Sequence, residues 1–175
     1  MEFEVDQPIE APLWLVEQAF VDPTFYDALG QLGAIEPPSM LECRPDETDE
    51  ALVHLAVHYT FGAKLNAAAR AVLDPAKLGW TDRSVLDRRA HEVRFEMVPD
   101  HYGDRFRCKG RYRFVEHGPS TTHQVMEGTL EINYPVVGAL AERAIYLGLR
   151  ENLASEAAIL GRWAAERETK ESDAG

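Results

Sequence analysis

The chain has 175 residues, which suits one domain of about 100–200 residues and leaves no room for a second enzyme domain. Hydrophobic residues make up 45% and charged residues 27%, as in an ordinary globular domain, which argues against a disordered or fibrous chain. The formal net charge of −12 repels polyphosphate and anionic lipid surfaces, so neither nucleic acid nor an acidic membrane is an expected partner.

Cysteine usage and the first residues of the chain indicate a cytoplasmic protein. Cys43 and Cys108 lie far apart without CxxC spacing, so neither a disulfide framework nor a zinc site is predicted. Residues 1–6 carry acids where a secretory signal needs bases and an apolar run, and no stretch approaches the roughly 18 apolar residues of a membrane span. We therefore expect a protein of the reducing cytoplasm that does not cross a membrane.

The beginning of the chain predicts one strand and two short helices. Residues 1–6 alternate apolar and acidic side chains, with the period of two of a half-buried strand. Apolar residues recur at helical spacing over residues 13–20, and Asp22-Pro23 supplies an N-cap and a first helical residue for a second helix. Gly30 and Gly33 are expected to end these helices, because glycine adopts a left-handed conformation at little cost.

Residues 40–134 predict a meander of antiparallel strands with one wet face and one dry face. Apolar and polar residues alternate along each strand, and turns rich in Pro, Asp and Gly separate the strands. The Ala-rich segment from Lys64 to Leu73 is predicted as a short helix between two strands. The dry face is expected to carry Val53, Leu55, Val57, Tyr59 and Phe61, then Val93, Phe95 and Met97, then Phe106, Cys108, Gly110, Tyr112 and Phe114, and finally Met126, Gly128, Leu130 and Ile132.

A single long helix is predicted from Pro135 to about Glu168, because proline suits the first turn and no proline follows it. Glu156 and the neighbouring charged residues are expected on azimuths away from the apolar stripe. We expect residues 1–168 to form one domain and residues 169–175 to be a polar, disordered tail. The stripe that should lie on the dry face of the sheet comprises Ile145, Leu149, Leu153, Leu160 and Ala164.

This order of elements resembles the helix-grip fold of the START-like superfamily, which includes lipid-transfer domains, the birch-pollen allergen group and aromatic polyketide cyclases. The segment Asp22-Pro23-Thr24-Phe25-Tyr26 looks like the turn that follows the first helix in that superfamily. Trp80 stands where one uncharacterised bacterial branch, a family of unknown function, carries a strand tryptophan, although Lys64-Leu65-Asn66 lacks the proline of that branch. Further similarity to the branch lies in Ile132-Asn133-Tyr134-Pro135-Val136-Val137-Gly138, Glu142, Asn152, Leu153 and Glu156.

The resemblance implies an α+β helix-grip fold, a curved antiparallel sheet wrapped around the long C-terminal helix with an apolar cavity between them. Gly110 and Gly128 are compatible with strong curvature, which either leaves unfilled volume or is accompanied by side chains that fill the interior to normal density. The residues expected to line the ligand cavity are Tyr59, Trp80, Phe95, Met97, Phe106, Cys108, Tyr112, Met126, Leu130, Ile145 and Leu149.

No catalytic residue, cofactor site or metal ligand is assigned from motifs. The GxSxG, GxGxxG, GxxxxGK[ST] and HExxH patterns do not occur. His54 and His58 would lie about 13 Å apart in a strand, so we expect two solvated histidines, and the other histidines have no acid at a recognisable spacing. Cys108 is expected to be a small buried hydrophobe rather than a nucleophile.

The densest positive charge runs along one predicted strand, from Arg105 to Arg113. An anion-binding face is one interpretation of this stripe. The favoured interpretation is a solvated face whose cations pair across the sheet with carboxylates, each pair contributing a few tenths of a kcal/mol. The carboxylates in question are Glu92, Glu96, Glu127 and Glu131.

The favoured function is the binding, sequestration or transport of a hydrophobic small molecule, such as a lipid, a fatty acid or a polyketide-like compound. The alternative is a cyclase or dehydratase enzyme that uses Tyr59, Tyr112 or an inward histidine or acid for proton transfer. Two polar groups that converge inside the cavity would support the enzyme, and a lining of carbon alone would oppose it. A partner-binding or stress-regulatory domain is a third possibility, with an exposed apolar patch as its signature.

Overall fold

The computed structural model describes residues 1–32, 36–60, 77–101, 103–133, 135 and 138–173. The predicted helix from Lys64 to Leu73 and the predicted inward residue Phe61 lie outside these ranges. The described elements are β1 (Glu2–Ile9), α1 (Leu13–Val21), α2 (Pro23–Leu29), the 3-10 turn η1 (Gly30–Leu32), β2 (Ser39–Pro45), β3 (Leu52–Thr60), β4 (Gly79–Asp87), β5 (Glu92–Pro99), β6 (Phe106–Glu116), β7 (Thr122–Ile132) and α4 (Gly138–Asp173).

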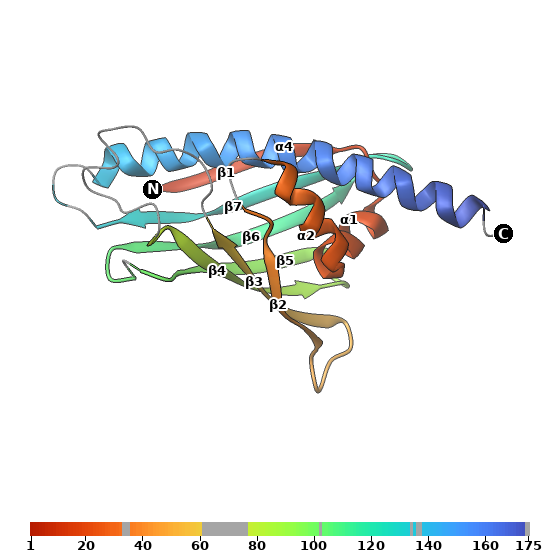
Figure 1. The fold of residues 1–175 in the computed structure, drawn as a ribbon, viewed down its shortest axis with the longest axis horizontal. Helices are drawn as coiled ribbons and strands as arrows, with labels where there is room; N and C mark the ends of the chain where they lie inside the picture. The colour runs from red at the N-terminus through yellow and green to blue at the C-terminus, as the bar shows by residue number, and fades with distance from the viewer. Residues whose placement is uncertain (33–35, 61–76, 102, 134, 136–137, 174–175) are drawn as a thin grey trace.

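The described strands form one antiparallel sheet that curves around α4 (Figure 1). Their spatial order is β1-β7-β6-β5-β4-β3-β2, so each strand from β2 to β7 pairs with its neighbours in sequence, and β1 closes the other edge beside β7. Helix α4 runs along β1 and β7, while α1 and α2 lie against the C-terminal half of α4. The structure thereby confirms the predicted helix-grip architecture, and the predicted dry face is the inner face of the sheet.

The start of α2 anchors the C-terminal half of α4. Asp22 caps α2 as predicted, because its Oδ1 accepts a hydrogen bond of 2.9 Å from the Thr24 backbone N–H. The Arg167 guanidinium donates to Asp22 Oδ2 at 2.8 Å, and Trp163 Nε1 donates to Thr24 Oγ1 at 3.1 Å. Partial burial acts to raise the pKa of Asp22, but the hydrogen bonds from Thr24 and Arg167 bring it below its ordinary value.

The ends of two helices differ from the prediction. Gly30 has a φ of −57°, in the right-handed region, so it does not end α2 by adopting a left-handed conformation. A larger residue would be crowded at this position, because a Cβ there would lie 2.7 Å from Pro37 Cγ. Gly33 lies outside the described residues. Helix α4 begins at Gly138 and continues to Asp173, beyond the expected end near Glu168, through Glu, Arg and Lys residues that favour helix. The domain boundary at residue 168 stays a prediction.

Ile145 does not belong to the buried stripe of α4, which corrects the prediction. Its exposed fraction is 43%, whereas Leu153 and Leu160 are buried and Leu149 is half-buried. Steps of four residues advance the azimuth by about 40° each, since a helical turn takes about 3.6 residues. Ile145 therefore points about 80° away from Leu153 and towards solvent.

Gly110 and Gly128 face each other across β6 and β7 at a point where the two backbones leave no room for a side chain. A Cβ on Gly128 would lie 2.5 Å from the Lys109 carbonyl oxygen, and a Cβ on Gly110 would meet the Glu127 carbonyl oxygen even more closely. Both obstacles are backbone atoms, which cannot move without disturbing the ladder of strand hydrogen bonds. The glycine pair therefore permits the close approach of β6 and β7 within the bent sheet.

Replacing Gly128 with Ala should destabilise the protein by about 1–3 kcal/mol, because the new methyl group forces the backbones apart. Urea unfolding followed by circular dichroism measures the change. The matched control is Gly148→Ala in α4, where a Cβ would meet nothing within 4 Å. That substitution should raise stability by about 0.5–1 kcal/mol, as expected for a helical glycine. A neutral Gly128→Ala change would contradict the proposed role of the pair.

Candidate functional site

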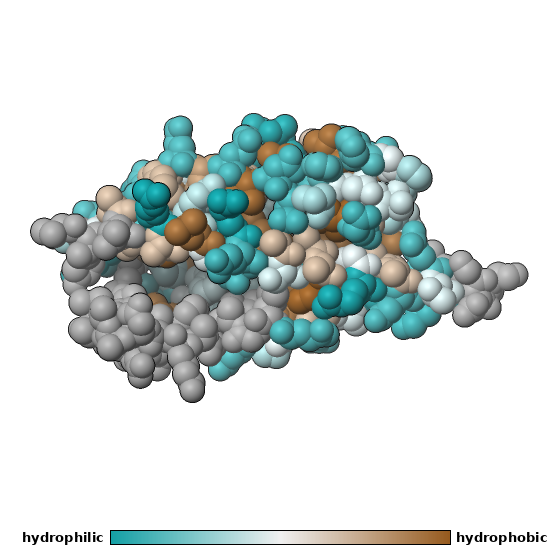
Figure 2. Space-filling model, turned by 90° about the horizontal axis from the view of Figure 1, so that it is seen from above, coloured by the Kyte–Doolittle hydropathy of each residue, from teal (hydrophilic) through white to brown (hydrophobic). Residues whose placement is uncertain are grey.

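The inner face of the sheet is densely packed at one end and accessible at the other. Leu86, Val93 and Met126, at the packed end, each have 0% of their surface exposed. Towards the start of α4, the inner side chains are only half-buried. On the face of the molecule shown in Figure 2, hydrophobic residues in brown lie among hydrophilic residues in teal. We call this region the open end of the inner face; its half-buried residues are Tyr59, Trp80, Asp82, Ser84, Met97, Phe106 and Ile132.

The open end exists because the start of α4 is held over β1 and β7. Glu142 Oε1 accepts a hydrogen bond of 3.0 Å from the Ile132 backbone N–H, and Glu142 Oε2 lies 3.5 Å from the amino group of Met1. One turn further along α4, Tyr146 packs against Phe3, with ring centroids 6.3 Å apart. These contacts hold the first turns of α4 at the β1 edge, away from the inner surfaces of β3, β4 and β5.

Asp82 is an ionisable group in an otherwise apolar part of the inner face. On β4 it lies between Val57 and Met97, its direct cross-strand partners. Its Oδ1 is buried and has no hydrogen-bond partner among the residues that the structure describes. Burial raises the pKa of Asp82 to about 7. An unpartnered buried carboxyl group costs stability, which makes Asp82 a candidate for function rather than for folding.

Glu156 presents a second carboxyl group from the opposite side of the interior. It lies on α4 three residues after Leu153 and four before Leu160, both of which are buried. Burial raises the pKa of Glu156 to about 7, and the negative charge of Asp82 adds to the effect. We call Asp82 and Glu156 the acid pair, with one member on the sheet and the other on the helix.

Two tyrosine hydroxyls and one thiol share the environment of the acid pair. Burial raises the pKa of Tyr59 and of Tyr112 well above the ordinary value, and the charges of Asp82 and Glu156 contribute to both shifts. Within the described part of the chain, neither hydroxyl has a hydrogen-bond partner. Burial, with a smaller effect of Asp82, raises the pKa of Cys108 to about 12, so the thiol stays protonated at neutral pH and is not a nucleophile.

The structure distributes the predicted cavity residues over three environments. Phe95, Cys108, Tyr112, Met126 and Leu130 are buried in the core. Half-buried positions at or beside the open end belong to Tyr59, Trp80, Met97, Phe106 and Leu149, and Ile145 is exposed. Tyr59 and Trp80 are direct partners on β3 and β4, with their rings stacked at 5.3 Å.

Sequence reasoning missed both members of the acid pair. The prediction that Glu156 lies away from the stripe is wrong, because spacings of three from Leu153 and four to Leu160 place it on the same side of the helix. Asp82 went unnoticed although it alternates in register with Trp80 and Leu86, which point inward. These spacings are the sequence signals that indicate an inward orientation for both carboxyl groups.

Histidine–carboxylate pairs occur on the surface, which corrects the prediction of no partner acid for His91 and His123, whereas His54 and His58 are partly solvated as predicted. His54 lies 2.8 Å from Asp46 and His58 lies 2.8 Å from Asp100. His91 lies 2.7 Å from Glu17 and His123 lies 2.9 Å from Asp6. All four acids come from other elements or turns, so spacing along the chain did not reveal them. Over the described residues, no group of three or more His, Cys, Asp or Glu side chains could hold a metal ion.

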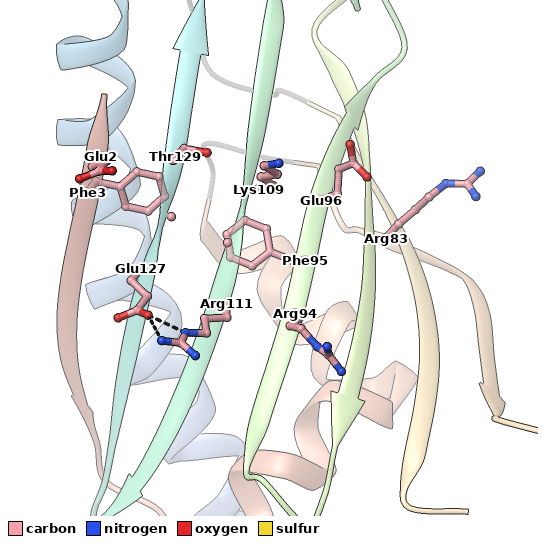
Figure 3. Close-up of a pocket in the computed structure, with 12 residues that line it drawn as sticks. Glu2, Phe3, Arg83, Arg94, Phe95, Glu96, Lys109, Arg111, Glu127 and Thr129 are labelled. Carbon is pink, nitrogen blue, oxygen red and sulfur yellow. Dashed lines mark hydrogen bonds and ion pairs between the residues drawn. The ribbon is translucent and has the colours of Figure 1, made fainter. Parts of the chain in front are cut away.

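A hollow of about 770 Å³ lies on the outer face of the sheet, over the glycine pair (Figure 3). Charged side chains from β4, β5, β6 and β7 surround it. The Arg111 guanidinium pairs with Glu127 and lies 3.2 Å from Glu92, and Arg113 lies 3.2 Å from Glu127. These contacts confirm the predicted cross-strand pairing for Arg111 and Arg113. Since the hollow is open and its charges are partly paired, the inner face is the better candidate site.

Comparison with known proteins gives a family and a fold. A family model described as a protein of unknown function, DUF2505, matches residues 4–164. A search of the curated proteins finds no match. Among solved structures, the chain is similar to TTHA0849 from Thermus thermophilus, with 19% identity, a TM-score of 0.66, and coverage of 95% of this chain and 99% of that chain.

Two similar structures belong to enzymes. The Zhui aromatase/cyclase from Streptomyces sp. R1128 has 15% identity, a TM-score of 0.62, and coverage of 97% of this chain and 95% of that chain. Norcoclaurine synthase from Thalictrum flavum has 15% identity, a TM-score of 0.62, and coverage of 95% and 87%. These similarities confirm the START-like helix-grip fold. Among the described helices, none is long and apolar enough to span a membrane.

The acid pair should make stability depend on pH. The folded protein holds a proton on Asp82 up to about pH 7, whereas the unfolded chain releases it near about pH 4. The free energy of unfolding therefore falls as the pH rises between these values. Asp82→Asn should make this decrease smaller. The free energy of unfolding of the variant, relative to that of the parent, should therefore rise by about 2–4 kcal/mol between pH 4 and pH 8. Urea unfolding at several pH values measures the change.

Glu96→Gln provides the control for this experiment. Glu96 lies on β5 and is exposed on the outer face, so the substitution removes the same charge without touching the interior. The pH dependence of Glu96→Gln should follow that of the parent. An Asp82→Asn variant with the same pH dependence as the parent would show that Asp82 titrates normally in the folded protein.

Proposed function

The chain belongs to the DUF2505 family, and we propose that this member binds an apolar small molecule between the sheet and α4. One observation carries the proposal: the open end combines half-buried apolar side chains with a buried carboxyl oxygen, Asp82 Oδ1, that has no hydrogen-bond partner among the described residues. Apolar surface buried there by a ligand contributes about 25 cal/mol per Å². A few polar groups in such a site then set the orientation of the ligand.

The ligand candidates are a lipid, a fatty acid or a polyketide-like compound, held for sequestration or transport in the cytoplasm. Met97, Phe106 and Leu149 offer flexible or flat apolar contacts. The stacked rings of Tyr59 and Trp80 provide a larger aromatic surface at the same end. These groups suit an elongated or planar apolar body.

Met97→Trp should fill part of the open end and lower the affinity for an uncharged apolar dye such as Nile red by at least about tenfold, equivalent to about 1.4 kcal/mol. The matched control is Val98→Trp, because Val98 is the next residue on β5, points outward and is 41% exposed. Fluorescence titration of both variants and the parent measures the affinities. Equal loss in both variants, or no uptake by the parent protein, would contradict the proposal.

A second candidate function, a cyclase or dehydratase, is favoured by the acid pair. Carboxyl groups with pKa values of about 7 are present in both protonation states at neutral pH. In this reaction the Asp82 carboxylate takes a proton from the carbon beside a ketone, and that carbon then bonds to a second ketone carbon. Glu156 gives its proton to the new alkoxide oxygen. The two groups exchange roles to expel the hydroxyl group as water.

Mass spectrometry tests this activity directly. A soluble aromatic poly-β-ketone incubated with the protein should lose the mass of one water per ring formed, faster than in buffer. Asp82→Asn should slow the conversion by at least about a hundredfold, as expected for the loss of a general base. Glu96→Gln should leave the rate unchanged. A parent protein that binds the compound without converting it would leave binding as the function.

A further inference from the structure

The interior around the proposed ligand site contains several groups that become negatively charged when they ionise. The groups whose charges act on one another in the interior are Asp82 on β4, Glu156 on α4, Tyr59 on β3, Tyr112 and Cys108 on β6, and Tyr26 on α2. Ionisation of any of them adds negative charge. No described cation is among the causes of the pKa shift of either member of the acid pair.

We propose that the ligand is an apolar amine, whose protonated amino group binds Asp82 while its apolar body occupies the open end. The inference rests on the proposed binding function and names the chemical class of the ligand. An ammonium group would bring hydrogen-bond donors and a positive charge to Asp82 Oδ1, which has no partner among the described residues.

The unpartnered oxygen atoms identify where the amino group binds. Asp82 Oδ1 is buried without a hydrogen-bond donor, and its carboxyl group is already removed from bulk water in the free protein. Tyr112 is only 9% exposed, and its hydroxyl can accept a further hydrogen bond. Tyr26 is different, because its hydroxyl already donates to the Phe20 carbonyl oxygen at 2.9 Å. Asp82, at the open end, therefore retains hydrogen-bonding capacity for a ligand, whereas Tyr112 lies between Val93 and Met126 at the packed end.

Charge and ring geometry favour a cation over an anion. Glu156 on α4 adds a second carboxyl group to the interior, so an ammonium group would be attracted from two sides. Tyr59 and Trp80 stack nearly parallel, with 5° between their planes, and Trp80 lies two residues before Asp82 on the same face of β4, where an aromatic ring can attract a cation. A fatty-acid carboxylate would be repelled by the same groups. This chemistry separates amines from the other apolar ligands considered above.

Three naphthalene compounds of similar size test the proposal: 1-naphthylmethylamine, 1-naphthylmethanol and 1-naphthoic acid. Calorimetric titration at pH 8 should show the amine binding at least about tenfold more tightly than the alcohol, and the carboxylate binding most weakly. At pH 5.5 the preference for the amine should shrink, because Asp82 and Glu156 are then protonated. The affinity for the alcohol should change little between the two pH values.

Variants assign the preference to Asp82. D82N should remove the advantage of the amine while the alcohol still binds, and the exposed control E96Q should keep the preference of the parent. A second measurement uses the parent protein alone, in buffers of different ionisation enthalpy at pH 6.5. Binding of the amine should release protons to the buffer, because the ammonium group favours the ionised form of Asp82. Binding of the alcohol should not.

The outcomes separate this proposal from the one on which it rests. Alcohol and amine binding with equal affinity, or a carboxylate binding more tightly than the amine, would overturn the amine proposal and leave apolar binding intact. An amine preference that survives in D82N, or amine binding without proton release, would also overturn it. Failure of all three compounds to bind at either pH would count against the proposed binding function itself.

Discussion

The width of one helix limits how much of the sheet α4 can cover. A helix with its side chains is about 10–12 Å across, whereas neighbouring strands are about 4.8 Å apart, so a single helix covers little more than two strands. Helix α4 is held at the β1 edge by Glu142 and Tyr146. At its C-terminal half, α1 and α2 widen the cover. No described helix does so at the open end, and inner side chains stay accessible there.

The bend of the sheet and the position of α4 act together. The glycine pair in β6 and β7 permits a backbone approach that no other residue allows, and Phe95 and Phe3 flank the pair in the same cross-strand row. Large rings beside missing side chains let the inner face curve towards the helix. The same row shapes the charged hollow on the outer face, so this hollow and the candidate ligand site lie on opposite faces of the sheet.

The acid pair is the feature that folding alone does not explain. Burying two carboxyl groups without a described cation beside them lowers stability as the pH rises from about 4 to about 7, whereas apolar residues of similar size would pack there without that cost. Binding of an amine and proton transfer both give the pair a use. They differ in what the second carboxyl group does, because Glu156 strengthens the attraction in one case and donates a proton in the other. The helix-grip fold is compatible with both, since a fold does not determine activity.

The sequence by itself determined the architecture, because alternation in the strands, the Asp22-Pro23 cap and the apolar stripe of α4 are local patterns set by backbone periodicity. The sequence also predicted which residues face the mainly apolar interior of the sheet, including Tyr59, Trp80 and Met97. Only the tertiary structure decided that Asp82 and Glu156 share one interior, that Ile145 points to solvent, and that four histidines have acid partners. The first two depend on the rotation of α4 about its axis, and the histidine pairs depend on which distant segments come into contact. Neither factor produces a periodic pattern in the sequence.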